Sequence, residues 1–138
     1  MTKIEIIDLI LGKYIENPEE RALEGGLIPR FITSDGKTDP IGFALLDPHQ
    51  FSHIVGGIFH LVLHYRQING WVGMRYFPRE LLRERFRGHE SVFWNDLQHF
   101  HDNNTYFTEN GLSQNGFAAL ANLKVKWDTI KHPVYGDF

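Results

Sequence analysis

The residues from Asp47 to Gln67, D-P-H-Q-F-S-H-I-V-G-G-I-F-H-L-V-L-H-Y-R-Q, decide how the rest of the chain is interpreted. Asp47 is a good N-terminal cap, and Pro48 suits the first helical position because its missing N–H group would have no partner there. No Lys, Arg, Asp or Glu occurs from Pro48 to Tyr65. Surface helices normally carry charge on their outer face. The stretch therefore predicts a largely buried central helix over residues 48–67.

Four histidines lie in one sector of this predicted helix, at the i, i+4 spacing that lets two imidazoles bind the same metal ion. The pairs are His49 with His53 and His60 with His64. Their centres are about 16 Å apart along a helix, so the two pairs cannot share one ion and each needs further ligands. The candidate ligands are His49, His53, His60, His64, His99 and His101. A zinc, iron or manganese site is therefore one hypothesis, and histidines that only pack at a polar helix edge are the alternative.

Two adjacent glycines, Gly56 and Gly57, fall in the same sector. Each costs roughly 1 kcal/mol relative to Ala inside a helix, so packing has to compensate. Because glycine lets another backbone or a ligand come close, the pair is a candidate binding element. A tightly crossing neighbouring helix explains the two glycines equally well.

Length and composition indicate one globular domain over residues 1–138. The formal net charge of −3 gives no general attraction to nucleic acid or to an anionic membrane. The absence of cysteine removes disulfides, thiolate metal sites and cysteine nucleophiles. We find neither a signal-peptide pattern nor an uncharged apolar run long enough to cross a membrane, so a cytoplasmic location without membrane contact is expected.

Before residue 47 the sequence predicts one clear helix and one extended region. Residues 2–5 form the capping-box pattern T-x-x-E, and the first helix is expected to end near Asn17. A hairpin or a pair of extended arms is expected over residues 28–46, around a turn at residues 34–37, with residues 41–45 in the second arm. We expect Asp39 to be a solvated turn residue.

After residue 67 three more helices are predicted. Pro78 opens a short helix over residues 79–87, and the next helix covers residues 90–100 with its aromatic and leucine side chains buried. Ser113 caps a last helix that extends to about Lys131. The expected core side of this helix is formed by Phe117, Leu120, Leu123, Trp127 and Ile130.

Basic and aromatic side chains gather between residues 71 and 87. The candidate binding residues of this arginine patch are Trp71, Arg75, Arg79, Arg83 and Arg87. In the predicted helix the last three arginines share one face, and arginines interleaved with aromatic residues can bind phosphate backbones or single strands. Residues 79–100 also have helix-turn-helix spacing. A solvated basic face, or a surface for an acidic protein partner, is the alternative.

Residues 106–111 and the helix that follows them resemble the wing and final helix of winged-helix regulators. The resemblance implies a regulator that binds nucleic acid. However, the second helix of the helix-turn-helix, residues 90–100, carries Glu90 and Asp96 and no Lys or Arg. This charge pattern disfavours a helix that faces phosphates. Nucleic-acid binding is therefore an alternative that we do not favour.

The expected architecture is mainly α, a compact bundle of about five to six helices around the central buried helix, with the short hairpin beside it. No P-loop, G-x-G-x-x-G, G-x-S-x-G or H-E-x-x-H pattern occurs, so the sequence favours a protein that is not an enzyme. The leading hypothesis is a small soluble binding or regulatory protein that acts through protein contacts, homodimer formation among them. A histidine-ligated metal protein and a helix-turn-helix nucleic-acid binder are the two alternatives.

Overall fold

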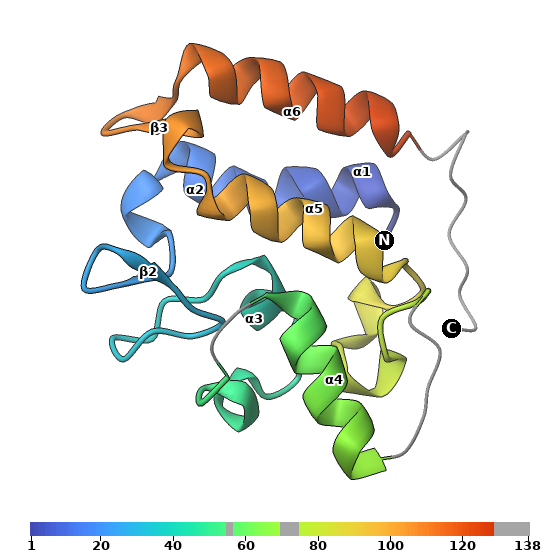
Figure 1. Ribbon diagram of the computed structural model, residues 1–138. Coiled ribbons are helices and arrows are strands. Elements are labelled where there is room, and N and C mark those ends of the chain that lie inside the picture. The colour runs from blue at the N-terminus through green and yellow to red at the C-terminus, as the bar shows by residue number, and fades with distance from the viewer. Residues whose placement is uncertain (55–56, 70–74, 129–138) are drawn as a thin grey trace.

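The computed structural model describes residues 1–54, 57–69 and 75–128. Within these residues the chain is mainly helical, with two small antiparallel hairpins (Figure 1). The expected mainly α class is therefore confirmed. No helix among the described residues combines the length and the apolar character needed to cross a bilayer.

The first helix is one long element, and its start follows the sequence prediction. The Thr2 hydroxyl accepts a hydrogen bond from the Glu5 N–H, and the Glu5 carboxylate accepts one from the Thr2 N–H, which completes the capping box. The helix ends at Asn17, as expected. Its consecutive parts are α1 (Lys3–Ile6), a π-helical segment (Ile7–Leu11) and α2 (Gly12–Glu16). The fully buried apolar residues of this helix are Ile6, Ile7, Ile10, Leu11 and Tyr14.

The region expected to be extended contains short strands followed by a helix. β1 (Leu23–Glu24) pairs antiparallel with β2 (Ile28–Pro29), and a bridge joins Ile32 to Thr38 around the predicted turn. Residues 41–45 are not an extended arm, because α3 (Pro40–Ala44) covers most of them. The prediction of two extended arms is therefore wrong for its second arm.

A local cap explains why α3 forms. Asp39 accepts a hydrogen bond from the Gly42 N–H at 2.7 Å, and Pro40 occupies the first helical position. Such a cap followed by proline favours a helix start. Gly42 is also required at its position, because a Cβ there would lie 1.8 Å from the Phe31 carbonyl oxygen. The cap and this close backbone contact together outweigh the strand preference of the side chains.

The largest error in the sequence prediction concerns the central helix. Residues 48–67 do not form one helix, since Pro48–Phe51 is a 3-10 turn capped by Asp47 and α4 (Ile58–Asn69) begins only after Gly57. Glycine is the least favourable helix residue after proline. The Gly-Gly pair in the sequence therefore opposes the helix that the apolar pattern alone predicts.

The predicted helix over residues 79–87 is also wrong. Two 3-10 turns, Arg79–Leu81 and Glu84–Phe86, occupy that stretch. Between them Leu82 is extended, fully buried, and joined to Leu45 by an antiparallel bridge. Backbone groups beside this bridge bond to the neighbouring chain segment, so they do not form the internal ladder of a helix. A tertiary contact thus decides the local structure here.

The second half of the fold begins with a helix that contacts several other elements. α5 (Ser91–Asp102) corresponds to the helix predicted over residues 90–100, and it contacts α3, α4 and the π-helical segment. Figure 1 shows α6 as an outer layer along α5 and the N-terminal helix. The elements that follow α5 are a 3-10 turn (Asn104–Tyr106), β3 (Phe107–Thr108), β4 (Gly111–Leu112) and α6 (Gln114–Lys126).

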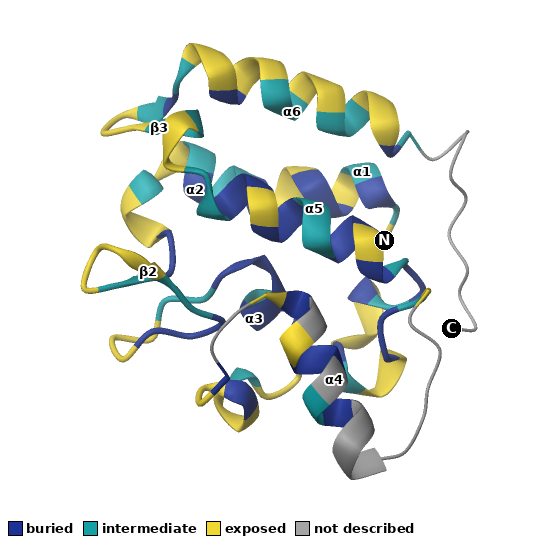
Figure 2. Ribbon diagram, in the orientation of Figure 1, coloured by how far each residue is buried: buried dark blue, intermediate teal, exposed yellow. Residues whose placement is uncertain are grey.

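The last helix is capped by Ser113 as predicted, but its orientation differs from the expected one. Phe117, expected in the core, is 63 % exposed. Gly116 faces inward instead, so close to Tyr106 that a Cβ would lie 2.2 Å from the Tyr106 carbonyl oxygen. This contact sets the rotation of α6 about its axis, and Phe117, about 100° further round, points outward. Figure 2 shows the exposed side of α6, while Ile130 lies outside the described residues.

Candidate functional site

The structure separates most of the histidines that the sequence groups together. His49 lies in the 3-10 turn and His60 lies on α4, and both are exposed. The ring of His53 packs against the ring of His64, with 5.1 Å between the ring centroids. The placement of His49 and His53 one turn apart on the same helix is therefore wrong, because the 3-10 turn ends before His53.

The two histidines expected to complete a metal site differ completely in environment. His99 is exposed on α5, whereas His101 is fully buried. Side chains two positions apart on a helix are rotated by about 200° around the helix axis, so they lie on nearly opposite sides. Across residues 1–54, 57–69 and 75–128, no group of three or more His, Asp or Glu side chains is close enough to hold a metal ion. These residues therefore supply no set of ligands for the predicted metal site.

The arginine patch does not form a continuous helical face. Because its residues lie in two separate turns, Arg79, Arg83 and Arg87 no longer share one side of a helix. Arg83 and Arg87 each donate from Nε to a backbone carbonyl oxygen, at 3.4 and 3.1 Å. The Arg75 guanidinium lies 5.5 Å from the ring centroid of the adjacent Tyr76. The expected helix-turn-helix over residues 79–100 is therefore not formed.

The remaining candidate binding residues are two glycines and a tryptophan. Gly56 and Trp71 lie outside the described residues. Gly57 is exposed, and no atom of a neighbouring segment lies within 4 Å of the point where a Cβ would stand. The described structure thus brings neither a helix nor a loop close to Gly57.

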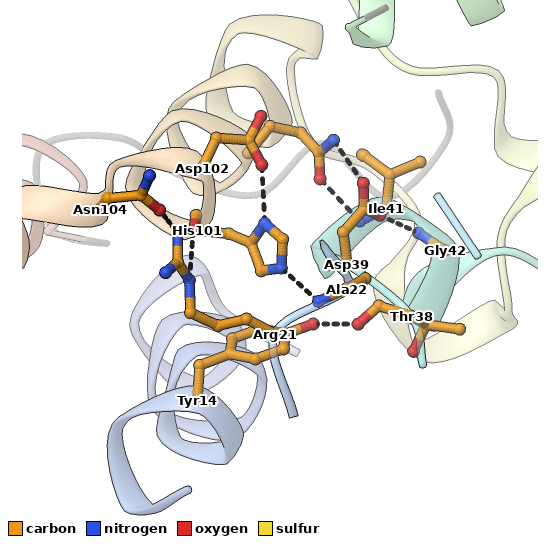
Figure 3. Close-up of polar contacts among 11 residues, drawn as sticks. Tyr14, Arg21, Ala22, Thr38, Asp39, Ile41, Gly42, His101, Asp102 and Asn104 are labelled. Carbon is orange, nitrogen blue, oxygen red and sulfur yellow. Dashed lines mark hydrogen bonds and ion pairs between the residues drawn. The ribbon is translucent and has the colours of Figure 1, made fainter. Parts of the chain in front are cut away.

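A buried polar network surrounds the C-terminal end of α5 instead (Figure 3). His101 Nε2 accepts a hydrogen bond from the Ala22 N–H at 2.9 Å, which places the ring proton on Nδ1. Nδ1 then donates to Asp102 Oδ1 at 2.7 Å. Burial lowers the pKa of His101, although the hydrogen bond to Asp102 acts in the opposite direction. The ring is therefore neutral near pH 7, and Asp102 is the charged member of the pair.

Arg21 and Tyr14 complete this network from the N-terminal part of the chain. Arg21 donates from Nε to the His101 carbonyl oxygen at 2.9 Å and from its terminal nitrogen to Asn104 Oδ1 at 3.0 Å. The Tyr14 ring meets the His101 ring edge to face, with 4.8 Å between centroids, and its hydroxyl donates to the Thr38 carbonyl oxygen at 2.6 Å. These contacts hold the N-terminal helix, the first hairpin and α5 together.

Asp39 is a second buried polar group at this end of the molecule. It is 1 % exposed, so the expectation of a solvated turn residue is wrong. Its carboxylate accepts hydrogen bonds from the Gly42 N–H and from Gln98 Nε2, both at 2.7 Å, and so links α3 to α5. Burial raises the pKa of Asp39 to about 8, while these two donors act in the opposite direction. The carboxyl group is a structural link between helices.

A groove of about 640 Å³ lies between α5 and α6. Phe100 and Tyr106 contribute aromatic rings to its lining, and Asp96 and Asp102 contribute carboxylates. Asp96 accepts hydrogen bonds from Lys126 Nζ at 2.7 Å and from the Trp127 indole N–H at 2.8 Å. The groove therefore combines a satisfied ion pair, aromatic surface and the charge of Asp102. It is one of two candidate binding features on α6.

The second feature is the outward side of α6. Phe117 and Val125 are 63 % and 65 % exposed, and Ala118 and Ala121 are also exposed. Phe117, Ala121 and Val125 follow one another at i, i+4, i+8 spacing, so they form one row along the helix. We call these three residues the outer ridge of α6. Exposed apolar residues are ordinary when single, but a contiguous row indicates a contact surface.

Sequence reasoning missed both features for different reasons. The spacing of Phe117, Ala121 and Val125 was a visible signal for the outer ridge. The sequence pattern also fits Phe117 to the core stripe, because its distances in sequence from Leu120 and Leu123 match that stripe. The groove needs α5 and α6 side by side, and no local pattern in the sequence predicts that arrangement.

Comparison with known proteins identifies no relative of this chain. No protein-family model, no curated protein sequence and no solved structure gives a significant match to the chain.

Proposed function

We propose that this protein is a small binding module that associates with a second copy of itself through the outer ridge of α6. One observation carries the proposal: an uninterrupted apolar row stands exposed on the outermost helix, with Phe117 and Val125 each more than half exposed. A helix usually buries its apolar stripe and presents charge to solvent. α6 has an apolar stripe on its inner side as well, so the outer ridge is additional to what the fold needs.

The order of side-chain sizes in the outer ridge suits a symmetric pair. A large residue stands at each end, Phe117 and Val125, and the small Ala121 stands between them. Two such helices can cross at Ala121, where the short side chains permit a close approach of the axes, as in ridges-into-grooves packing at about −50°. In a two-fold arrangement Phe117 of each copy then lies near Val125 of the other. The same surface thus serves both copies, as an isologous contact requires.

The charges on α6 do not oppose this contact. Lys124 Nζ lies 2.7 Å from Asp8, and Lys126 Nζ lies 2.7 Å from Asp96, so both lysines are paired within their own chain. No Asp, Glu, Lys or Arg occurs from Gln114 to Leu123. Two copies can therefore approach without placing unpaired like charges against each other.

The size of the outer ridge sets the strength of association that we expect. A single helix crossing buries much less than the roughly 1,600 Å² of a standard stable interface. We therefore expect a reversible dimer with a dissociation constant on the order of 10–100 μM. Such a dimer forms at high local concentration and dissociates on dilution.

The experiment is sedimentation velocity on the full chain from low micromolar to several hundred micromolar concentration. The Ala121→Glu variant puts a carboxylate at the crossing point, and we expect it to weaken dimerisation by at least about tenfold. Asn115→Glu is the matched control, because it adds the same charge to an exposed position of α6 outside the outer ridge. This control should dimerise like the unmodified chain, and circular dichroism should show all three proteins folded.

Two results would overturn the proposal. One is a chain that stays monomeric at every concentration, which would leave the outer ridge to a different partner or to none. The other is a dimer that Ala121→Glu and Asn115→Glu affect equally, since that dimer would use another surface.

A further inference from the structure

The groove between α5 and α6 carries one carboxylate whose hydrogen-bond partner is a neutral ring. We infer that this groove binds an organic cation, an alkylammonium or guanidinium group, with Asp102 as its charge partner and the rings of Phe100 and Tyr106 as its walls. The inference concerns the inner side of α6 and a small charged group, so it is independent of self-association through the outer ridge.

Asp102 supplies the charge. Its Oδ1 accepts a hydrogen bond from His101, and Figure 3 shows the second carboxylate oxygen turned away from that ring. The Asp102 side chain is 33 % exposed, and it lines the groove. The Arg21 guanidinium interacts electrostatically with Asp102. Its hydrogen bonds go to the His101 carbonyl oxygen and to Asn104, so it does not occupy the second carboxylate oxygen. Hydrogen bonds from a cation to a carboxylate are stronger than those between neutral partners.

The other charged pair in the groove does not compete for a ligand. Lys126 Nζ lies 2.7 Å from Asp96 Oδ2, and the Trp127 indole N–H donates to the same oxygen at 2.8 Å. These contacts satisfy Asp96 and Lys126 with each other, so their charges cancel. Among the residues that line the groove, the remaining formal charge is therefore that of Asp102, which favours a cation over an anion.

Aromatic rings elsewhere in the groove lining supply the second element of cation recognition, with Tyr106 more accessible than Phe100, which is 4 % exposed. The ring centroids of Phe100 and Tyr106 lie 5.2 Å apart, and both residues line the groove. A cation placed over an aromatic face gains attraction from the ring quadrupole. The protein already uses this contact beside the groove, where the Arg21 guanidinium lies 4.3 Å from the ring centroid of Phe107. Phe107 in turn packs edge to face against Phe100, with 5.8 Å between centroids.

The experiment uses four ligands of equal chain length and different charge. The cations are n-butylguanidinium and n-butylammonium, and the controls are neutral n-butanol and anionic butyrate. Two-dimensional amide NMR at pH 8, where unperturbed imidazoles are neutral, follows residues of α5 and α6 during each titration. We expect both cations to shift amide signals around the groove, with millimolar dissociation constants as is usual for fragments of this size. Butanol and butyrate should bind at least about tenfold more weakly.

The variant that tests the charge is Asp102→Asn. An asparagine still offers an oxygen to His101 Nδ1, so the buried network keeps its hydrogen bond while the groove loses its charge. We expect the affinity for n-butylguanidinium to fall by about tenfold or more. Asp8→Asn is the matched control, because Asp8 is an exposed carboxylate that pairs with Lys124 outside the groove lining. This control should bind the cation like the unmodified chain.

The natural source of the cation can be a free amine or a side chain of another protein, and a further titration distinguishes the two. A blocked tripeptide with a central arginine should bind more tightly than n-butylguanidinium if the groove is shaped for a protein segment, and less tightly if it is shaped for a free amine. Ala121→Glu should bind the cation unchanged, because its substitution lies on the outer ridge. Butanol binding as tightly as the cations, or an Asp102→Asn variant with unchanged affinity, would overturn the inference.

Discussion

The two ends of α5 hold the fold together in different ways. At the C-terminal end, His101 uses both ring nitrogens in hydrogen bonds, and Arg21 donates to two separate acceptors. At the N-terminal end, Lys3 is fully buried with its Nζ 3.0 Å from the Glu90 carboxylate. The first end relies on directed hydrogen bonds, and the second relies on charge and on contact with rings.

The N-terminal end contains several buried polar atoms that make no hydrogen bond to the described part of the chain. Lys3 Nζ lies 5.8 Å from the Phe93 ring centroid and 5.7 Å from the Trp127 ring centroid, so aromatic faces surround the charge. Apart from the Lys3–Glu90 ion pair, the buried atoms at this end without a hydrogen bond are His89 Nδ1, Ser91 Oγ and Trp94 Nε1. A buried polar atom without a hydrogen bond costs roughly 1–3 kcal/mol. This end is therefore held by burial and charge pairing at a cost that the other end avoids.

The comparison teaches that equal burial does not imply equal sensitivity to substitution. His89 and His101 are both fully buried histidines near the ends of the same helix. His101 satisfies a backbone N–H that has no access to water, whereas His89 bonds through Nε2 to the Met1 carbonyl oxygen at 2.9 Å, near the chain terminus. Removing a partner is costly where the remaining group stays buried. The C-terminal end should therefore be the more sensitive of the two.

The largest effect is expected for His101→Leu. The substitution leaves the Ala22 N–H without its acceptor and Asp102 without its donor, so we expect a loss of about 3 kcal/mol in the free energy of unfolding. Urea denaturation followed by tryptophan fluorescence measures this loss. His99→Leu is the matched control, because it removes an exposed histidine from the same helix and should change stability by less than about 0.5 kcal/mol. Similar losses for the two variants would contradict the role assigned to the buried network.

The second prediction concerns pH, because buried groups near the two ends respond with opposite signs. Burial raises the pKa of Asp39 to about 8 from 3.8, so its stabilisation is lost as pH rises from about 4 through 8. Burial lowers the pKa of His89 to about 4 from 6.5, so its stabilisation is present above pH 6.5 and is lost as pH falls toward 4. His101, whose pKa burial also lowers, acts with the same sign as His89.

Of Asp39, His89 and His101, Asp39 is the one that affects the slope between pH 6.5 and 8, so that window gives the cleanest test. We expect the free energy of unfolding of the unmodified chain to fall there by up to about 1.4 kcal/mol per pH unit. Asp39→Asn keeps an acceptor for the Gly42 N–H and should flatten this slope. Urea denaturation at several fixed pH values measures it. Parallel pH profiles for the two proteins would show that Asp39 does not titrate in this range.

The smallest effect is expected where a charged pair is replaced as a whole. Lys3→Met combined with Glu90→Gln removes both charges at the N-terminal end and keeps side chains of similar volume. Replacing a buried ion pair in this way is often neutral or stabilising, so we expect a stability within about 1 kcal/mol of the unmodified chain. Glu90→Gln alone leaves the Lys3 charge buried and should be clearly less stable. A double variant that loses as much as His101→Leu would remove the contrast between the two ends.

Local signals in the sequence predicted part of the fold correctly. The capping box at residues 2–5, the end of the first helix at Asn17 and the Ser113 cap of α6 are all present. The helix over residues 90–100 is also confirmed, with Phe93, Trp94, Leu97 and Phe100 buried. The caps and the helix end depend on groups within about one helical turn of each other, and the helix over residues 90–100 depends on a pattern of about two turns. Tertiary contacts with the rest of the molecule therefore have little effect on these local helix signals.

Two other predictions that depended on periodicity failed. The apolar pattern of residues 48–67 and the spacing of Arg79, Arg83 and Arg87 both indicated helices that the structure replaces with turns. In the first case a glycine pair opposes the helix, and in the second a bridge between Leu45 and Leu82 uses the backbone groups. Helical periodicity shows which side chains can share a face, but it does not show that the backbone is free to form the helix.

By itself, the sequence determined the mainly α class, the helix caps and the core side of α5, because those depend on interactions between residues close along the chain. Only the tertiary structure decided which histidine is buried, why Phe117 points outward, and that Asp102 lies in a groove between two helices. The close contact of Gly116 with the Tyr106 carbonyl oxygen sets the rotation of α6, and this rotation places the outer ridge and the groove on opposite sides of one helix. A steric contact between different elements fixes that rotation, whereas the amphipathic pattern of α6 is compatible with more than one.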